Sequence, residues 1–461
     1  MDVLTRTNER RSRRSPQRWA TALLAAVVLS AMGETGIDGQ SAATTLGIPG
    51  RTNAHVSLAA EGEIVVAAWA ASLPSGVTDV FVAVSRDAGL TFGIPTRVNS
   101  EIGDARINGE QPPRVAVRTR FEGSEPMVTV LWTSRGASGT TLLQGRSSDG
   151  GKSFSRSAVV EGTDAPGNRG WQAIAADRDG WLHAMWLDHR ELTAGNTAKP
   201  SGGTHNHAGH GTVGTTAAAA TGDATDGVAM AAKSKLYIGM LSEVDHGPPA
   251  PRPITGGVCY CCKTALAIGP PGSVFAAWRH VYPGNLRDIA FSMSRDGGRT
   301  YSEPIRVHED QWQLNGCPDD GPAMVVDPDA RIHIVWPTVV LEKGEPVKAL
   351  FHTSSPDGRG FGTRTRIPAR GFGNHPQVAL AADGSLVMAW DELADGSRHV
   401  GLARGIVDRS GLISLTRLPL EDDLSPVGVY PAVAGAGDHA VVAWTSTADK
   451  QSMIRIVRRR M

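Results

Sequence analysis

The chain has 461 residues, in which 46 Lys and Arg balance 46 Asp and Glu. A balanced charge leaves no basic footprint for nucleic acid, so we expect no nucleic-acid partner. Glycine is abundant with 54 residues and proline is common with 28, a composition that favours a soluble, turn-rich β-protein. Length alone suggests two or three domains, but internal repeats favour a single one.

The N-terminal residues have the layout of a secretory signal. An arginine-rich segment, residues 10–18, precedes an apolar run over residues 19–29, and small residues follow at Ala31 and Gly33. The run is short for a bilayer span, so an uncleaved anchor is the alternative. We therefore expect residues 1–33 to be a signal peptide, and the mature protein to be a secreted or periplasmic monomer. Membrane attachment is expected only through an uncleaved N-terminal segment.

Seven apolar runs along the chain end in tryptophan, roughly sixty residues apart except for one longer interval. The seven are Trp69, Trp132, Trp186, Trp278, Trp336, Trp390 and Trp444. Each run reads as a short buried strand, with an alternating strand before it and another after the following polar loop. Each repeat is therefore a small antiparallel sheet, and we interpret the tryptophans as core residues that pack between sheets.

A second motif follows the third strand of three repeats. It occupies residues 85–92, 147–154 and 294–301, and a shortened copy spans 355–361. Serine, Asp, Gly, Ser or Thr, and an aromatic residue keep their offsets. The motif resembles the Asp-box, or bacterial neuraminidase repeat, of sialidase-like β-propellers. Asp accepts backbone N–H bonds in tight turns and Gly permits positive φ, so we expect these Asp residues to support turns.

The number of repeats predicts a closed ring of seven blades. The first six repeats have a fourth strand and the last has three, while residues 46–53 echo residues 92–99. An N-terminal strand would therefore complete the last blade and remove the open sheet edges. We predict an all-β fold, a seven-bladed propeller of four-stranded antiparallel blades over residues 34–461. The long interval, residues 191–233, is expected to be an inserted flexible loop.

The resemblance also implies which face carries function. In sialidase-like propellers the Asp-box turns lie on one face, and the active site lies on the other, where first strands begin and post-Trp loops end. Arg279 resembles one of three arginines that grip the substrate carboxylate, a role that suits its planar fork. Tyr430 is placed like the nucleophilic tyrosine. The expected catalytic set is Tyr430, Arg279 and Asp188, and the expected ligand-binding set is Arg114, Arg190, Arg279 and Arg287.

Part of the sialidase pattern is absent. Residues 258–265 contain no carboxylate to take the proton of Tyr430, and residues 53–57 lack the first arginine of the triad. His55 and His375 are interpreted as ordinary rim residues. The sequence therefore predicts an exported propeller that binds or hydrolyses a glycan or a small anionic ligand, exo-sialidase-like if it is an enzyme.

Cysteine and histidine support an alternative. The four cysteines are Cys259, Cys261, Cys262 and Cys317, and the inserted loop carries His205, His207 and His210. In an exported protein Cys317 is expected to pair with one of the other three, or the cluster is a redox or metal site. Three imidazoles within six residues suit copper or zinc, and nearby thiolates favour Cu(I). A metal or thiol-redox propeller and a non-catalytic interaction scaffold are the two alternatives.

Overall fold

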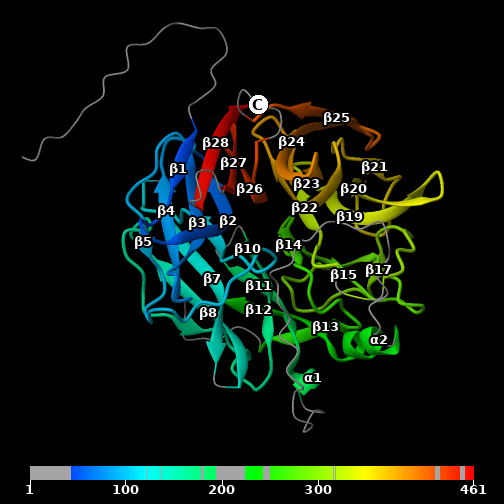
Figure 1. Ribbon diagram of the computed structural model, residues 1–461, viewed down its shortest axis with the longest axis horizontal. Helices are drawn as coiled ribbons and strands as arrows, with labels where there is room; N and C mark the ends of the chain where they lie inside the picture. Colours follow the sequence, from blue (N-terminus) through cyan, green and yellow to red (C-terminus); the bar gives the residue numbers. More distant parts are fainter. Residues whose placement is uncertain are drawn as a thin grey trace, which may run out of the picture. The chain divides into compact units, whose positions relative to one another are not determined.

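The computed structural model describes residues 43–121, 123–136, 138–177, 181–193, 224–241, 250–314, 316, 318–420, 426–446 and 452–461. These residues lie in one compact unit, Gln40–Met461. Their strands form seven four-stranded antiparallel sheets, arranged as the blades of a ring (Figure 1). The predicted seven-bladed β-propeller is confirmed. No helix in the described ranges is both long and apolar enough to cross a membrane.

Blades 1 to 3 each begin with an inner strand and continue outward in chain order. Blade 1 contains β2 (Thr52–Glu61), β3 (Ile64–Ser72), β4 (Thr78–Ser85) and β5 (Thr96–Arg97). Blade 2 contains β6 (Arg114–Arg118), β7 (Met127–Gly136), β8 (Gly139–Ser147) and β9 (Ala158–Val159). Blade 3 contains β10 (Arg169–Ala176), β11 (Leu182–Asp188), β12 (Lys235–Leu241) and β13 (Arg252–Gly256).

Blades 4 to 6 repeat this order, and blade 7 takes one strand from the other end of the described chain. Blade 4 contains β14 (Ala265–Ile268), β15 (Val274–Arg279), β16 (Ile289–Ser294) and β17 (Ile305–Arg306). Blade 5 contains β18 (Ala323–Val326), β19 (Ile332–Glu342), β20 (Glu345–Ser355) and β21 (Thr365–Arg366). Blade 6 contains β22 (Phe372–Leu380), β23 (Leu386–Ala394), β24 (Ser397–Val407) and β25 (Ile413–Leu418). Blade 7 contains β26 (Val429–Ala436), β27 (His439–Ser446), β28 (Met453–Arg460) and β1 (Thr44–Leu46).

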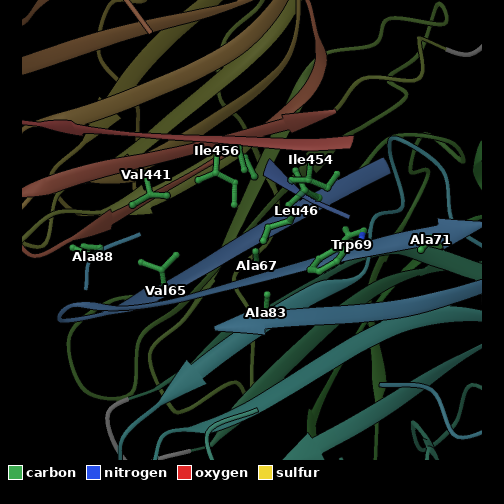
Figure 2. Close-up of a cluster of buried hydrophobic side chains, with 14 residues drawn as sticks. Leu46, Val65, Ala67, Trp69, Ala71, Ala83, Ala88, Val441, Ile454 and Ile456 are labelled. Carbon is green, nitrogen blue, oxygen red and sulfur yellow. The ribbon is translucent and has the colours of Figure 1, made fainter. Parts of the chain in front are cut away.

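The seven tryptophans lie in the core, as their apolar surroundings in the sequence predict. Each is at most 1% exposed and belongs to the second strand of its blade. Hydrophobic clusters join the strands of neighbouring blades, so the blades are held to one another by apolar packing. Trp69, for example, packs with residues of both blade 1 and blade 7 (Figure 2).

The ring closes through β1, which pairs with β28 in the last blade. Leu46 lies opposite Ile454 and is 7% exposed. It packs in the cluster drawn in Figure 2, between strands from the two ends of the chain. The predicted closure is confirmed, but the strand ends at Leu46, where the predicted segment begins. Gly50 adopts φ 74° in the turn that follows, which ends the extended conformation before β2.

Two helices lie in the insertion of blade 3. These are α1 (Arg190–Thr193) and α2 (Ala224–Lys233), and Ala231 of α2 is buried beside Cys259 and Cys261. Alanine favours helix, and packing on the propeller stabilises this segment further. The helix α2 was not predicted from the sequence. His205, His207 and His210 lie outside the described residues.

The Ser-x-Asp turns use their carboxylates in hydrogen bonds within the turn. In blade 4, Ser294 Oγ donates to Asp296 Oδ1 at 2.7 Å. Thr300 donates to the same carboxylate through its N–H, at 2.8 Å, and through its hydroxyl, at 2.6 Å. Asp87 and Asp149 accept corresponding bonds in blades 1 and 2. These contacts agree with a turn-supporting role for the three Asp residues.

Candidate functional site

In four blades the first strand contains a β-bulge, and one residue of each bulge has a positive φ. The register shifts in β2, β10, β22 and β26, and the residues with positive φ at these shifts are His55, Trp171, His375 and Tyr430. A bulge re-aims one side chain, and a bulky residue with positive φ costs about 1–3 kcal/mol of strain. The same unfavourable geometry thus recurs at one position of four blades.

Three of these bulge residues line one cavity of about 50 Å³. We call it the axial pocket, because side chains from the inner strands of separate blades form it. Its polar lining consists chiefly of His55, Glu110, Arg114, Lys263, His375 and Tyr430. The volume is far below the roughly 300 Å³ at which ligand pockets usually begin, so it admits an ionic group and not a whole sugar ring.

Tyr430 lies directly against the segment that carries Glu110. A Cβ atom added to Gly109 would lie only 1.9 Å from Cζ of Tyr430, so glycine is required for this approach. Burial, and then the charge of Glu110, raises the pKa of Tyr430. The phenol is therefore protonated at neutral pH and has a carboxylate as its neighbour.

Glu110 is buried and only partly satisfied. It is 1% exposed, and its Oε2 accepts the backbone N–H of Lys263 at 2.8 Å. Its Oε1 has no hydrogen-bond partner. Burial raises the pKa of Glu110 to about 7, although the charges of Lys263 and His375 oppose this shift. The carboxyl group is therefore able to gain and lose a proton near neutral pH, as a general acid or base must.

His375 is fixed by carboxylates from two blades. Its Nδ1 lies 2.9 Å from Oδ2 of Asp391, and its backbone N–H donates to Oδ1 of Asp320 at 3.0 Å. The same Oδ2 of Asp391 accepts the N–H of Tyr430 at 2.9 Å. Burial lowers the pKa of His375, but Asp391 and Asp320 outweigh this effect and leave it raised. The imidazole ring lies 4.1 Å from the Tyr430 ring, between centroids.

Two more cations line the axial pocket. Lys263 is 3% exposed and donates through Nζ to the carbonyl of Pro376 at 2.7 Å. Arg114 donates through Nε to the carbonyl of Gln172 at 3.0 Å. Burial lowers the pKa of Arg114 to about 10, which Glu110 partly opposes, so the guanidinium stays charged at neutral pH. Together with His375 these groups make the pocket suitable for an anion.

A metal-binding role for the pocket is less favoured. One ligand atom each from Glu110, Asp320 and His375 lies within 4.8 Å of the others. Asp320 already accepts from Lys348 Nζ at 2.9 Å and from the His375 N–H. Two carboxylates and one imidazole are a known kind of metal-ligand set. Because Asp320 and Glu110 already accept hydrogen bonds from groups of the protein, we treat the three residues as an acid–base network.

Arg279 lies at the boundary of blades 4 and 5 and does not line the axial pocket. It is 1% exposed and donates to the carbonyls of Asp320, Arg287 and Pro337, at 3.1, 2.6 and 2.7 Å. Its guanidinium also lies 4.8 Å from the ring centre of Trp312. In this arrangement Arg279 braces three backbone segments.

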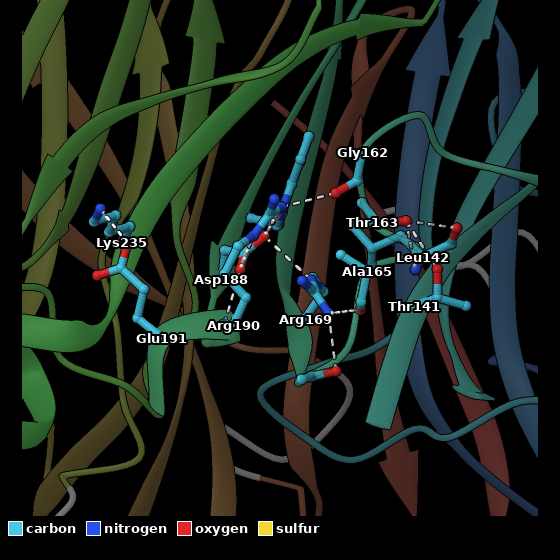
Figure 3. Close-up of polar contacts among 12 residues, drawn as sticks. Thr141, Leu142, Gly162, Thr163, Ala165, Arg169, Asp188, Arg190, Glu191 and Lys235 are labelled. Atoms are coloured by element: carbon cyan, nitrogen blue, oxygen red, sulfur yellow. Dashed lines mark hydrogen bonds and ion pairs between the residues drawn. The ribbon is translucent and has the colours of Figure 1, made fainter. Parts of the chain in front are cut away.

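Asp188 forms a buried ion-pair cluster in blade 3 (Figure 3). Its carboxylate lies 3.2 Å from Nε of Arg169 and 2.6 Å from Nη2 of Arg190. Arg190 also donates to the carbonyl of Gly162 at 2.8 Å. The predicted site residues Asp188 and Arg190 therefore contact each other, but they do not line the pocket that contains Tyr430. Of the predicted ligand-binding arginines, only Arg114 lines the axial pocket.

The cysteine cluster lies at the start of blade 4. The Sγ atoms of Cys259, Cys261 and Cys262 are 3.5–3.9 Å apart, and all three residues are buried. Cys259 and Cys262 are free thiols, whereas Cys261 is in a disulfide. Arg287, predicted as a ligand-binding residue, donates through Nη1 to Sγ of Cys259 at 3.3 Å. Cys317 lies outside the described residues.

Glu110 and Lys263 were not predicted as site residues from the sequence, and His375 was predicted to be an ordinary rim residue. One signal was available. In each blade, the residue before the tryptophan pairs with a first-strand residue, and in blades 1, 3, 6 and 7 the bulge residue lies two residues before that partner. In blades 1, 4, 6 and 7 this offset holds His55, Lys263, His375 and Tyr430. Aligning the first strands would have collected four polar side chains at one level of the ring.

Comparison with known proteins supports the fold. No family model and no curated protein matches this sequence. Solved structures do match: an ulvan lyase of polysaccharide lyase family PL25 has a TM-score of 0.53 at 9% identity, with 91% of this chain and 98% of that chain covered. A GH93 α-L-arabinofuranosidase of Fusarium graminearum has a TM-score of 0.47 at 9% identity, covering 92% and 98%. A Hadza microbial sialidase has a TM-score of 0.47 at 12% identity, covering 89% and 66%. The chain has a seven-bladed β-propeller fold.

Proposed function

We propose that this protein is an exported glycan-active propeller that acts on an anionic sugar at the axial pocket. The observation that carries the proposal is the contact of Tyr430 with the Gly109–Glu110 segment, where Glu110 keeps one unpartnered carboxylate oxygen. Propellers of this fold include proteins named as a sialidase, an arabinofuranosidase and an ulvan lyase. The arginine-rich start and apolar run of the sequence support export.

The proposed substrate binds through its charged group. Arg114, Lys263 and protonated His375 supply positive charge from three separate blades, which suits a carboxylate or sulfate. The cavity of about 50 Å³ holds that group, and the sugar ring lies over the mouth of the pocket. Arg279 is left out of this proposal because its donors are used on backbone carbonyls.

In the proposed reaction Glu110, as carboxylate, takes the proton of the Tyr430 hydroxyl. The phenolate attacks the anomeric carbon, a Tyr430 O–C bond forms and the glycosidic C–O bond breaks. His375 protonates the leaving oxygen through Nε2, since its Nδ1 is held by Asp391. Water then attacks the anomeric carbon and gives a proton to His375, while the bond to the Tyr430 oxygen breaks and Glu110 returns its proton to that oxygen. Glu110 thus supplies the carboxylate that the strand over residues 258–265 lacks.

The test is turnover of a fluorogenic sialoside and of a panel of uronate-containing oligosaccharides. Tyr430→Phe and Glu110→Gln should each lower kcat by at least about 100-fold while the variant protein remains folded at the assay pH. Tyr301→Phe is the matched control, because Tyr301 is a mostly buried tyrosine outside the pocket whose hydroxyl has no partner. Full activity in Tyr430→Phe would refute the proposal, as would the absence of turnover and of binding across the panel.

A further inference from the structure

Cys259 and Cys262 form a buried dithiol with a C-x-x-C spacing. They are 1% and 2% exposed, and their Sγ atoms lie 3.5 Å apart. Both are free thiols, although the neighbouring Cys261 is disulfide-bonded. A disulfide bond has an S–S distance of about 2.05 Å, so the two sulfur atoms must move closer together to form one. The proposed glycan chemistry uses neither residue.

Arg287 is the second observation that marks this pair as reactive. Its side chain is completely buried, and its Nη1 lies 3.3 Å from Sγ of Cys259. Nε and Nη2 of Arg287 have no partner, and no carboxylate within the described ranges forms an ion pair with it. A buried guanidinium is costly unless an anion accompanies it. The group in position to be that anion is the thiolate of Cys259.

The two sulfurs therefore differ in character. A hydrogen bond with Cys262, together with the charges of Arg287 and Arg279, lowers the pKa of Cys259 to about 6 against the effect of burial. Burial and the neighbouring Cys259 raise the pKa of Cys262. A thiolate beside a protonated thiol is the arrangement that C-x-x-C oxidoreductases use for exchange. Geometry and electrostatics thus assign separate roles to the two residues.

We propose that Cys259 and Cys262 are a thiol–disulfide exchange centre whose attacking thiolate is stabilised by Arg287. The Cys259 thiolate attacks one sulfur of a small-molecule disulfide, forms a mixed disulfide and releases one thiolate. Cys262 then loses its proton and attacks Sγ of Cys259, which forms the Cys259–Cys262 bond and releases the second thiolate. Two protein thiols are oxidised and one disulfide is reduced to two thiols, so electrons balance. This proposal is independent of the proposed glycan activity.

The experiment equilibrates the full-length protein with mixtures of oxidised and reduced glutathione and follows thiol loss by alkylation and mass spectrometry. Cys259 and Cys262 should lose reactivity together and regain it on reduction. Cys262→Ser should stop at a glutathione adduct on Cys259, whereas Cys259→Ser should form no adduct on the native protein. Thiols that stay reduced across all mixtures until the protein is denatured would overturn the proposal.

Arg287→Gln tests the role of the guanidinium. Losing the charge that favours the reduced thiolate should raise the equilibrium constant for disulfide formation by about tenfold or more. Arg299→Gln is the matched control, since Arg299 is an exposed arginine of the same blade. An unchanged equilibrium constant in folded Arg287→Gln would remove Arg287 from the proposal. A metal ion bound by Cys259 and Cys262 in the purified protein, in place of any exchange with glutathione, would overturn it in favour of a thiolate metal site.

Discussion

Substituting Glu110 by glutamine should change how the stability of the propeller depends on pH. Burial raises the pKa of Glu110 from 4.5 to about 7, which corresponds to up to about 3 kcal/mol between its two protonation states. Because the folded protein holds this proton more tightly than the unfolded chain, the stability that Glu110 contributes is full below pH 4.5. It is lost as the pH rises to about 7. Glutamine is neutral throughout and still accepts the N–H of Lys263.

The assay is chemical denaturation of wild type and Glu110→Gln at several values from pH 4.5 to pH 8. As the pH rises through this range, the unfolding free energy of the variant should increase relative to that of wild type by up to about 3 kcal/mol. Glu303→Gln is the control, because Glu303 is an exposed glutamate outside the pocket. Identical pH dependence in wild type and Glu110→Gln would show that Glu110 is ionised normally, and would remove the acid–base argument for the axial pocket.

Three further substitutions test how the fold is held together. Trp390→Phe should destabilise the protein by about 1–2 kcal/mol more than Trp444→Phe does. The reason is that Nε1 of Trp390 donates to buried Glu392 at 2.9 Å, whereas Nε1 of Trp444 has no partner. Equal losses of unfolding free energy in denaturation would contradict this prediction. Asp296→Ala should cost about 1 kcal/mol and leave turnover unchanged, since its bonds lie within one turn; a loss of activity in a kinetic assay would argue for a functional role. Leu46→Asp should lower the melting temperature strongly and expose β28 to proteolysis, because a charge would be buried at the ring closure; a wild-type melting curve would contradict the closure.

The fold was predictable because its signals are local and repeated. Each tryptophan ends a short apolar strand, so Trp69 and its six counterparts mark the blades without knowledge of any long-range contact. The closing strand was also predictable, because residues 46–53 repeat the pattern of residues 92–99. The observed strand lies nearer the N-terminus than predicted, because the chain turns at Gly50 before β2, and a pattern of apolar residues does not reveal this turn.

The site was harder to predict because it depends on residues far apart in the sequence. Glu110 and Tyr430 are separated by more than three hundred residues, and their contact depends on the glycine at position 109. The bulges that direct His375 and Tyr430 into the pocket are backbone features, and alternation of apolar residues does not report them. The role of Arg279 was inferred from its place after a strand, but its hydrogen bonds depend on carbonyls of the next blade.

The pairing of β1 with β28 makes folding depend on the order of synthesis. Leu46 emerges from the ribosome early, but its partner Ile454 is made about four hundred residues later. Until then β1, the outer strand of blade 7, lacks its partner β28, and its unpaired edge is open to other chains. A nascent or truncated chain of this protein is therefore expected to aggregate more readily than the finished ring, and a chaperone that holds the early strands apart would favour its assembly.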